Sequence, residues 1–212
     1  MEKATLQFVL VFSLLFVSLT FAQVKISGGL FGGVNYAGIT VDPVPAGQSN
    51  SKYLIGFQFG GVLNFGFAGG YSIRTEPMYL QIGAKTTRAN TEIKTKESYF
   101  SLPVMFTYAF ETGSNKFQPY IMAGPVMGIL LSAKYVFSNG NETDAKDLLK
   151  SVDFSATFGA GVNIAAGSNT VFIEGRYSLG FSNINNNPAS PNTTIKTKGY
   201  GLNAGITFPF GN

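Results

Sequence analysis

Residues 100–110 decide how this chain folds, and they read Phe100-Ser101-Leu102-Pro103-Val104-Met105-Phe106-Thr107-Tyr108-Ala109-Phe110. Large apolar side chains occupy the even positions, and smaller or more polar side chains predominate at the odd ones. Successive side chains of a β-strand point to opposite faces of the sheet. This period of two therefore predicts a strand with one strongly apolar face.

The same alternation recurs along the rest of the chain. Four further segments alternate as regularly, and they are residues 26–36, 55–65, 154–164 and 200–210. Three segments alternate less regularly, and they are residues 73–85, 117–134 and 171–181. Together with residues 100–110, they predict eight strands.

The composition indicates which solvent the apolar faces meet. The chain is 45% hydrophobic but only 12% charged, and the second face of each strand consists mainly of Gly, Ser, Thr, Asn and Gln. Small polar residues suit a narrow enclosed interior, and a closed barrel leaves no backbone group unpaired in lipid. We therefore predict an all-β fold, an eight-stranded antiparallel up-and-down transmembrane β-barrel. The alternative is a soluble lipocalin-like carrier, which would turn its large apolar residues inward and need more charges outside.

The N-terminus has the parts of a secretory signal peptide. Lys3 supplies the positive charge, residues 6–17 are mostly apolar, and Ala22 is a small residue at the expected cleavage point. The apolar run is shorter than the roughly 20 residues that a membrane-spanning helix needs. We expect residues 1–22 to be a signal peptide and residues 23–212 to form one barrel domain.

The segments that join the strands alternate in length. The long ones are residues 37–53, 86–98, 136–152 and 183–197, and the short ones are residues 66–70, 111–116 and 166–169. This alternation is typical of outer-membrane barrels, which have long outer loops and short periplasmic turns. We expect the protein in the bacterial outer membrane with both termini in the periplasm. The polar composition of the long segments predicts mobile loops.

Aromatic residues near the strand ends favour the same placement. In a membrane barrel such residues form a girdle at each membrane surface. The candidates for the two girdles are Tyr36, Phe65, Tyr99, Tyr108, Phe110, Tyr135, Phe181 and Tyr200.

The missing residue types exclude much chemistry. The sequence has no His and no Cys, which removes the commonest general base, the commonest metal ligand and every thiolate. We expect no catalytic, metal-binding or cofactor-binding residues, no cofactor and no enzyme activity. The net charge of +4 is scattered along the chain, so nucleic acid is not an expected partner. The remaining functions are a structural, anchoring or partner-binding barrel and, as the alternative, a small porin-like channel for ions or small solutes.

Four charged residues are expected inside the barrel. Glu174 and Arg176 lie on the face of their strand opposite its apolar residues, and Arg74 and Glu76 share one face of the third strand, where parity alone leaves the direction ambiguous. The third and seventh strands of an eight-stranded ring lie opposite each other, and both pairs are at similar distances from short turns. We therefore predict a charge network that plugs the lumen, with separate, water-surrounded charges as the alternative.

Several motifs resemble one known family. Residues 117–125 read FQPYIMAGP and residues 174–184 read EGRYSLGFSNI, with supporting motifs at residues 101–104 and 158–162. They resemble strands of the PorT-like outer-membrane barrels of Bacteroidetes. The resemblance implies an eight-stranded barrel, and some members of that family are linked to the type IX secretion and gliding machinery. The expected partners are membrane lipids, lipopolysaccharide, the barrel-assembly machinery and, through this link, secretion-system proteins.

Overall fold

The computed structural model describes residues 24–44, 51–88, 91–113 and 116–210. The expected signal peptide, residues 1–22, lies outside the described residues. The strands are β1 (Lys25–Asp42), β2 (Lys52–Gly66), β3 (Tyr71–Thr75), β4 (Met78–Arg88), β5 (Thr91–Ala109), β6 (Phe117–Phe137), β7 (Glu142–Asp144), β8 (Val152–Ala166), β9 (Asn169–Gly180) and β10 (Thr194–Phe210). Two short 3-10 helices are η2 (Ala68–Gly70) and η3 (Lys146–Leu148). No helix in the described part of the chain is long and apolar enough to cross a membrane.

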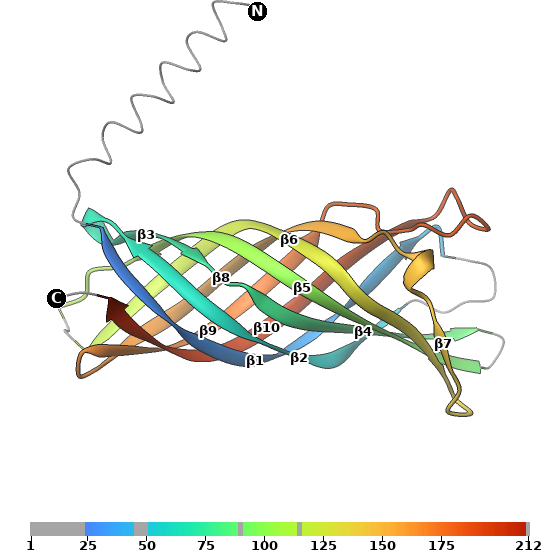
Figure 1. Ribbon diagram of the computed structural model, residues 1–212, viewed down its shortest axis with the longest axis horizontal. Helices are drawn as coiled ribbons and strands as arrows, with labels where there is room; N and C mark the ends of the chain where they lie inside the picture. Colours follow the sequence, from blue (N-terminus) through green and yellow to red (C-terminus); the bar gives the residue numbers. More distant parts are fainter. Residues whose placement is uncertain (1–23, 45–50, 89–90, 114–115, 211–212) are drawn as a thin grey trace, which may run out of the picture.

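The sheet closes into a barrel because β1 pairs with β2 on one side and with β10 on the other (Figure 1). The β1–β10 seam runs from Ile26 opposite Phe210 to Asp42 opposite Thr194. All pairings are antiparallel, β3 and β4 follow one another as a single broken strand, and β7 is an extension beside β6. The ring therefore passes through eight strands, which confirms the predicted fold.

The third strand of the ring is broken, whereas the sequence predicted a continuous strand over residues 73–85. The break lies at Glu76 and Pro77, between β3 and β4. Proline has no backbone N–H and cannot donate to a neighbouring strand. Its carbonyl still accepts a hydrogen bond of 3.0 Å from the N–H of Gly61, and the N–H of Glu76 donates to the carbonyl of Pro103 at 3.3 Å. The barrel wall therefore stays connected across the break.

The apolar faces of most strands point outward, as the transmembrane prediction requires, but in β4 the apolar residues Met78, Ile82 and Ala84 are buried on the inner side. Leu30 and Ile55 expose 69% and 78% of their surface, while Asn35 on the opposite face of β1 exposes 5%. Exposure of apolar surface to water is unfavourable, so an outer surface of this kind is suited to contact with lipid. The distribution is the reverse of what a soluble lipocalin-like carrier needs, and that alternative is therefore wrong.

The interior contains large side chains as well as the small polar ones expected from the sequence. Tyr120 and Phe172 are almost completely buried in the lumen. Glycines give them room: a Cβ at Gly205 would lie 2.4 Å from Cζ of Phe172, and one at Gly161 would lie 2.6 Å from Cζ of Tyr120. These large lumen side chains therefore depend on glycine in the neighbouring strand, where Gly205 is paired with Phe172 and Gly161 with Tyr120.

The two ends of the barrel differ, and we name them by their connections. The turn end is where β1 begins, β10 ends and the short connections lie; the loop end is the opposite one. The sequence predicted a loop over residues 86–98 at the loop end. This prediction is wrong, because β4 and β5 remain paired as far as Arg88 opposite Thr91. Its polar side chains suggested a loop, but β-pairing uses backbone groups and tolerates polar residues outside the membrane.

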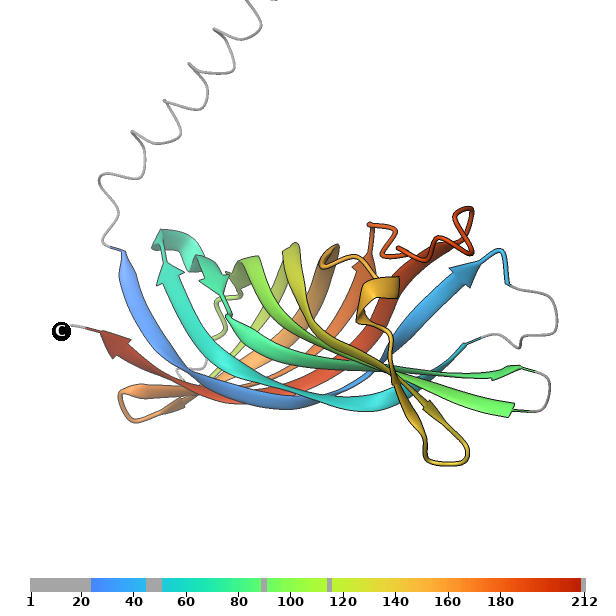
Figure 2. The same cartoon turned by 45° about the vertical axis from the view of Figure 1, so that its right-hand side comes forward.

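Two strand extensions project at the loop end (Figure 2). One is formed by β4 and β5, and the other by β6 and β7. In the second extension Lys134 donates a hydrogen bond of 2.9 Å to Glu142. This bond lowers the pKa of the Glu142 carboxyl.

Two long connections pack against the mouth of the barrel at the loop end. Ile184 is fully buried, Leu149 exposes 5%, and both join an apolar cluster with Tyr99 and Leu130 from the barrel wall. Leu149 also forms a β-bridge with Asn185. We call this apolar cluster the mouth cluster. Parts of these connections are therefore folded onto the barrel, unlike the mobile loops expected from their composition.

The girdle prediction is wrong for Tyr99. Tyr99 exposes only 2%, because odd-numbered positions of this part of β5 face the lumen. Tyr36, Phe110, Phe181 and Tyr200 expose between 41% and 57% and lie on the outer surface. The remaining candidates, Phe65, Tyr108 and Tyr135, are partly buried.

Candidate functional site

The four charged residues singled out in the sequence lie together in the lumen. Arg74 comes from β3, Glu76 from the break after it, and Glu174 and Arg176 from β9. Their side chains expose between 0% and 6% of their surface. The break does not disturb the inward direction of Glu76, which remains on the same face as Arg74.

Each arginine contacts both glutamates. Arg176 Nη1 lies 2.6 Å from Glu76 Oε2, and its Nη2 donates to Glu76 Oε1 at 2.7 Å and also to Glu174 Oε1. Arg74 Nε lies 2.7 Å from Glu76 Oε1, and its Nη1 donates to Glu174 Oε2 at 3.2 Å. The four residues form a closed arrangement of alternating charge, which we call the ion cluster. Its net formal charge is zero.

Neutral residues donate hydrogen bonds to Glu174 of the ion cluster. Tyr120 donates to Glu174 Oε2 at 2.5 Å, and Asn203 Nδ2 donates to Glu174 Oε1 at 3.2 Å. Asn203 in turn accepts a hydrogen bond of 2.5 Å from Gln58. Hydrogen bonds to a buried carboxylate offset part of the cost of removing it from water.

Aromatic rings cover both guanidinium groups. Arg74 Cζ lies 4.1 Å from the ring centroid of Phe172, and Arg176 Cζ lies 5.6 Å from that of Phe31. A cation over an aromatic face is attracted by the negative charge of that face. The rings also occupy lumen space that water would otherwise fill.

Sequence reasoning missed these neutral partners of the ion cluster. Tyr120 and Asn203 each have the lumen-facing parity of their strand, so alternation could have placed them inside. Parity does not give their depth relative to Glu174, because depth depends on the register between β6, β8, β9 and β10. That register is a property of the closed ring.

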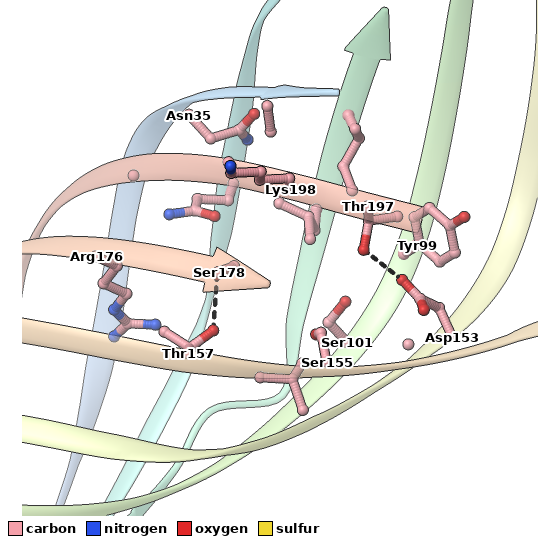
Figure 3. A pocket seen from close by; sticks show the side chains of 18 of the residues that line it. Asn35, Tyr99, Ser101, Asp153, Ser155, Thr157, Arg176, Ser178, Thr197 and Lys198 are labelled. Carbon is pink, nitrogen blue, oxygen red and sulfur yellow. Dashed lines mark hydrogen bonds between the residues drawn. The ribbon is translucent and has the colours of Figure 1, made fainter. Parts of the chain in front are cut away.

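The ion cluster separates two cavities. On the turn side lies a vestibule of about 930 Å³, lined by Arg74, Tyr120 and Phe172. On the loop side lies a cavity of about 60 Å³, lined by Arg176 and Asn35 (Figure 3). The first could hold many water molecules and the second only a few. Arg74 and Arg176 therefore face different compartments of the lumen.

A second group of buried carboxylates lies nearer the loop end. Glu97 accepts a hydrogen bond of 2.8 Å from Tyr99. Asp153 accepts hydrogen bonds of 2.7 Å from Thr197 and 2.5 Å from Ser182, the first of which is drawn in Figure 3. Hydroxyl groups donate to both carboxyl groups. Among the described residues, no cation lies within ion-pair distance of either one. Both were overlooked in the sequence, although their odd positions share the inward parity of β5 and β8.

Comparison with known proteins identifies the family. The outer membrane protein beta-barrel domain family matches residues 21–186 of this chain, so the chain belongs to that family. None of the curated proteins compared with it matches significantly.

Solved structures show the same fold. The chain is similar to the outer membrane protein OprG from Pseudomonas aeruginosa, with a TM-score of 0.52 and 13% identity over 89% of this chain and 96% of OprG. It is similar to Neisserial surface protein A, with a TM-score of 0.50 and 16% identity over 86% of this chain and 97% of that one. At these identities the similarity concerns the fold alone. The protein is therefore an outer-membrane β-barrel.

Proposed function

We propose that this protein is a closed outer-membrane barrel with a structural, anchoring or partner-binding role, and that it is neither a diffusion channel nor an enzyme. The observation that carries the proposal is that packed side chains occupy the barrel at two levels. The ion cluster lies across the middle of the lumen, and the mouth cluster, which includes Leu149 and Ile184, lies at the loop end. An eight-stranded barrel is narrow enough for side chains to fill it.

The orientation is part of the proposal. The described chain enters at Lys25 and leaves at Phe210 on the same end of the barrel, where the short turns also lie. In outer-membrane barrels short turns face the periplasm. Both termini would then be periplasmic, and the loop end would face the cell exterior.

The partner class follows from the exposed extensions and from the sequence motifs. The β4–β5 and β6–β7 extensions project beyond the ring and pair with each other through β5 and β6, so they offer a protein partner the outer backbone edges of β4 and β7 and charged side chains. The resemblance to PorT-like barrels supports secretion-system proteins as that partner. The barrel-assembly machinery would act earlier, during insertion.

Solute flux tests the closed-barrel proposal against the porin-like alternative. Proteoliposomes containing the purified barrel should swell in isotonic solutions of small sugars no faster than protein-free liposomes. Swelling that increases with the amount of protein and falls with the size of the sugar would instead show a diffusion channel. Crosslinking in intact cells, followed by purification through a periplasmic C-terminal tag, would identify the partner.

A further inference from the structure

Lys198 lies on the outer surface of the barrel among tyrosines. It belongs to the outward-facing series of β10, with Tyr200 and Leu202, which expose 55% and 58%. Lys198 Nζ lies 5.8 Å from the ring centroid of Tyr177 on β9. The centroids of Tyr177 and Tyr200 are 5.2 Å apart.

A second pair of tyrosines borders Lys198 on its other side. The rings of Tyr36 and Tyr53 are 5.6 Å apart, and Tyr36 is directly opposite Tyr200. Gly38 is directly opposite Lys198, and a Cβ at Gly38 would lie 2.8 Å from Cδ1 of Tyr53. The absence of a side chain at Gly38 therefore lets the ring of Tyr53 lie over β1, beside Lys198.

This group sits where the apolar band ends. On β1 the exposed apolar series runs from Ile26 to Tyr36, and on β10 it runs from Phe210 back to Tyr200. The next outward positions toward the loop end are Lys198 and then Lys196. Tyrosine and lysine at such a boundary keep their apolar parts against lipid and their polar ends at headgroup level.

The polar ends of the group are predominantly hydrogen-bond donors. Lys198 takes part in none of the ion pairs formed among the described residues. An ammonium group offers three N–H donors, and each tyrosine hydroxyl can donate as well. Such a group is complementary to an anion, and at the level of the headgroups the available anion is a lipid phosphate.

We propose that Lys198, with Tyr36, Tyr53, Tyr177 and Tyr200, forms a binding site for a phosphate of lipid A, the membrane-embedded part of lipopolysaccharide. The site rests on the proposed function, because it requires the loop end to face the cell exterior, where the outer leaflet carries lipopolysaccharide. The tyrosine rings pack beside the acyl chains, and Lys198 pairs with the phosphate. The barrel thereby holds one lipid molecule at the β9–β10–β1–β2 surface.

Native mass spectrometry of the detergent-solubilised full barrel with added diphosphoryl lipid A tests the site. Lys198→Gln should lower the bound fraction at subsaturating lipid A about fivefold, the effect expected for one lysine near an anionic lipid surface. Lys196→Gln is the matched control, because Lys196 lies on the same face of the same strand but makes no cation–π contact with a ring of the described residues. The control should bind lipid A like the wild type. Both variants must first show wild-type heat modifiability, which establishes that they are folded.

Two comparisons make the phosphate requirement explicit. The wild type should retain dephosphorylated lipid A or phosphatidylglycerol at least several-fold less than diphosphoryl lipid A. The site would be overturned if the wild type retained dephosphorylated lipid A or phosphatidylglycerol as well as diphosphoryl lipid A. Unchanged lipid A binding by Lys198→Gln would overturn it too. Failure of the proposed orientation is a separate result, seen when a label at the loop end cannot be reached in intact cells.

Discussion

Arg176 of β9 and Glu76 beside β3 contact each other at 2.6 Å across the lumen, although their strands occupy opposite sides of the ring. The contact joins two walls of the barrel that share no backbone hydrogen bonds. The ion cluster therefore links opposite walls of the barrel, and we expect it to act as a cross-brace as well as a plug.

Removal of one charge should destabilise the barrel. Arg176→Ala leaves Glu76 and Glu174 facing each other with only Arg74 between them. The free energy of unfolding should fall by about 3–5 kcal/mol, the usual effect of breaking a buried ion pair from one side. Urea unfolding in lipid vesicles measures it, and Glu174→Ala should act in the same direction. Lys134→Ala, which breaks an exposed pair, is the control and should change little. Equal small changes in all three variants would refute the bracing role.

The effects of the two substitutions should not add. Once Arg176 is absent, Glu174 has lost one of its two cationic partners. Glu174→Ala should therefore lower the free energy of unfolding less in that background than in the wild type. A double-mutant cycle should give a coupling free energy of about 0.5–3 kcal/mol. Strict additivity within about 0.5 kcal/mol would mean that the two side chains act independently.

Closure of the β1–β10 seam should depend on Gly29. A Cβ at this position would lie 1.8 Å from the carbonyl oxygen of Ile206 on β10, so Gly29→Ala cannot be accommodated without moving backbone. The variant should lose heat modifiability, running on a denaturing gel at the same position before and after boiling. Gly175→Ala is the control, since nothing lies within 4 Å of a Cβ there. A normally folded Gly29→Ala barrel would show that the seam tolerates a wider spacing.

Insertions in two loop-end connections should have different effects. Near Asn139–Asn141 the turn is exposed and contacts little else, so a short tag should be tolerated and cleaved by protease added to intact cells. Near Asn186 and Asn187 the same tag should also be accessible but should lower stability, because Ile184 is buried in the mouth cluster and Asn186 donates to the carbonyl of Asp147. Unfolding midpoints of the two tagged proteins provide the comparison. Identical midpoints would show that the mouth cluster contributes no stability.

Alternation was sufficient to predict the eight-stranded ring and the outward apolar face of most strands, but not the direction of β4, where Met78 and Ile82 are buried. In residues 100–110 every even position is large and apolar, and the structure exposes Phe100, Val104 and Phe106. The break at Pro77 was missed because a proline in one strand leaves the periodicity on either side unchanged. The polar hairpin ending at Arg88 and Thr91 was missed because its residues resemble those of a loop.

The candidate site was predictable in its members but not in its contacts. Parity placed Glu174 and Arg176 inside, and ring geometry placed the third strand across from them. The roles of Tyr120 and Asn203 depend on strand register and tilt, which arise only when the ring closes. The mouth cluster likewise depends on how Leu149 and Ile184 fold back over the barrel, and no local pattern encodes this.

Electrical recording of the wild-type barrel in planar lipid bilayers tests the central claim most directly. If the ion cluster and the mouth cluster close the lumen, inserted barrels whose folding is verified by heat modifiability should give no discrete conductance steps in concentrated potassium chloride. Reproducible steps of uniform size, proportional to the amount of folded protein and absent from a mock preparation, would show an open pore and contradict the account.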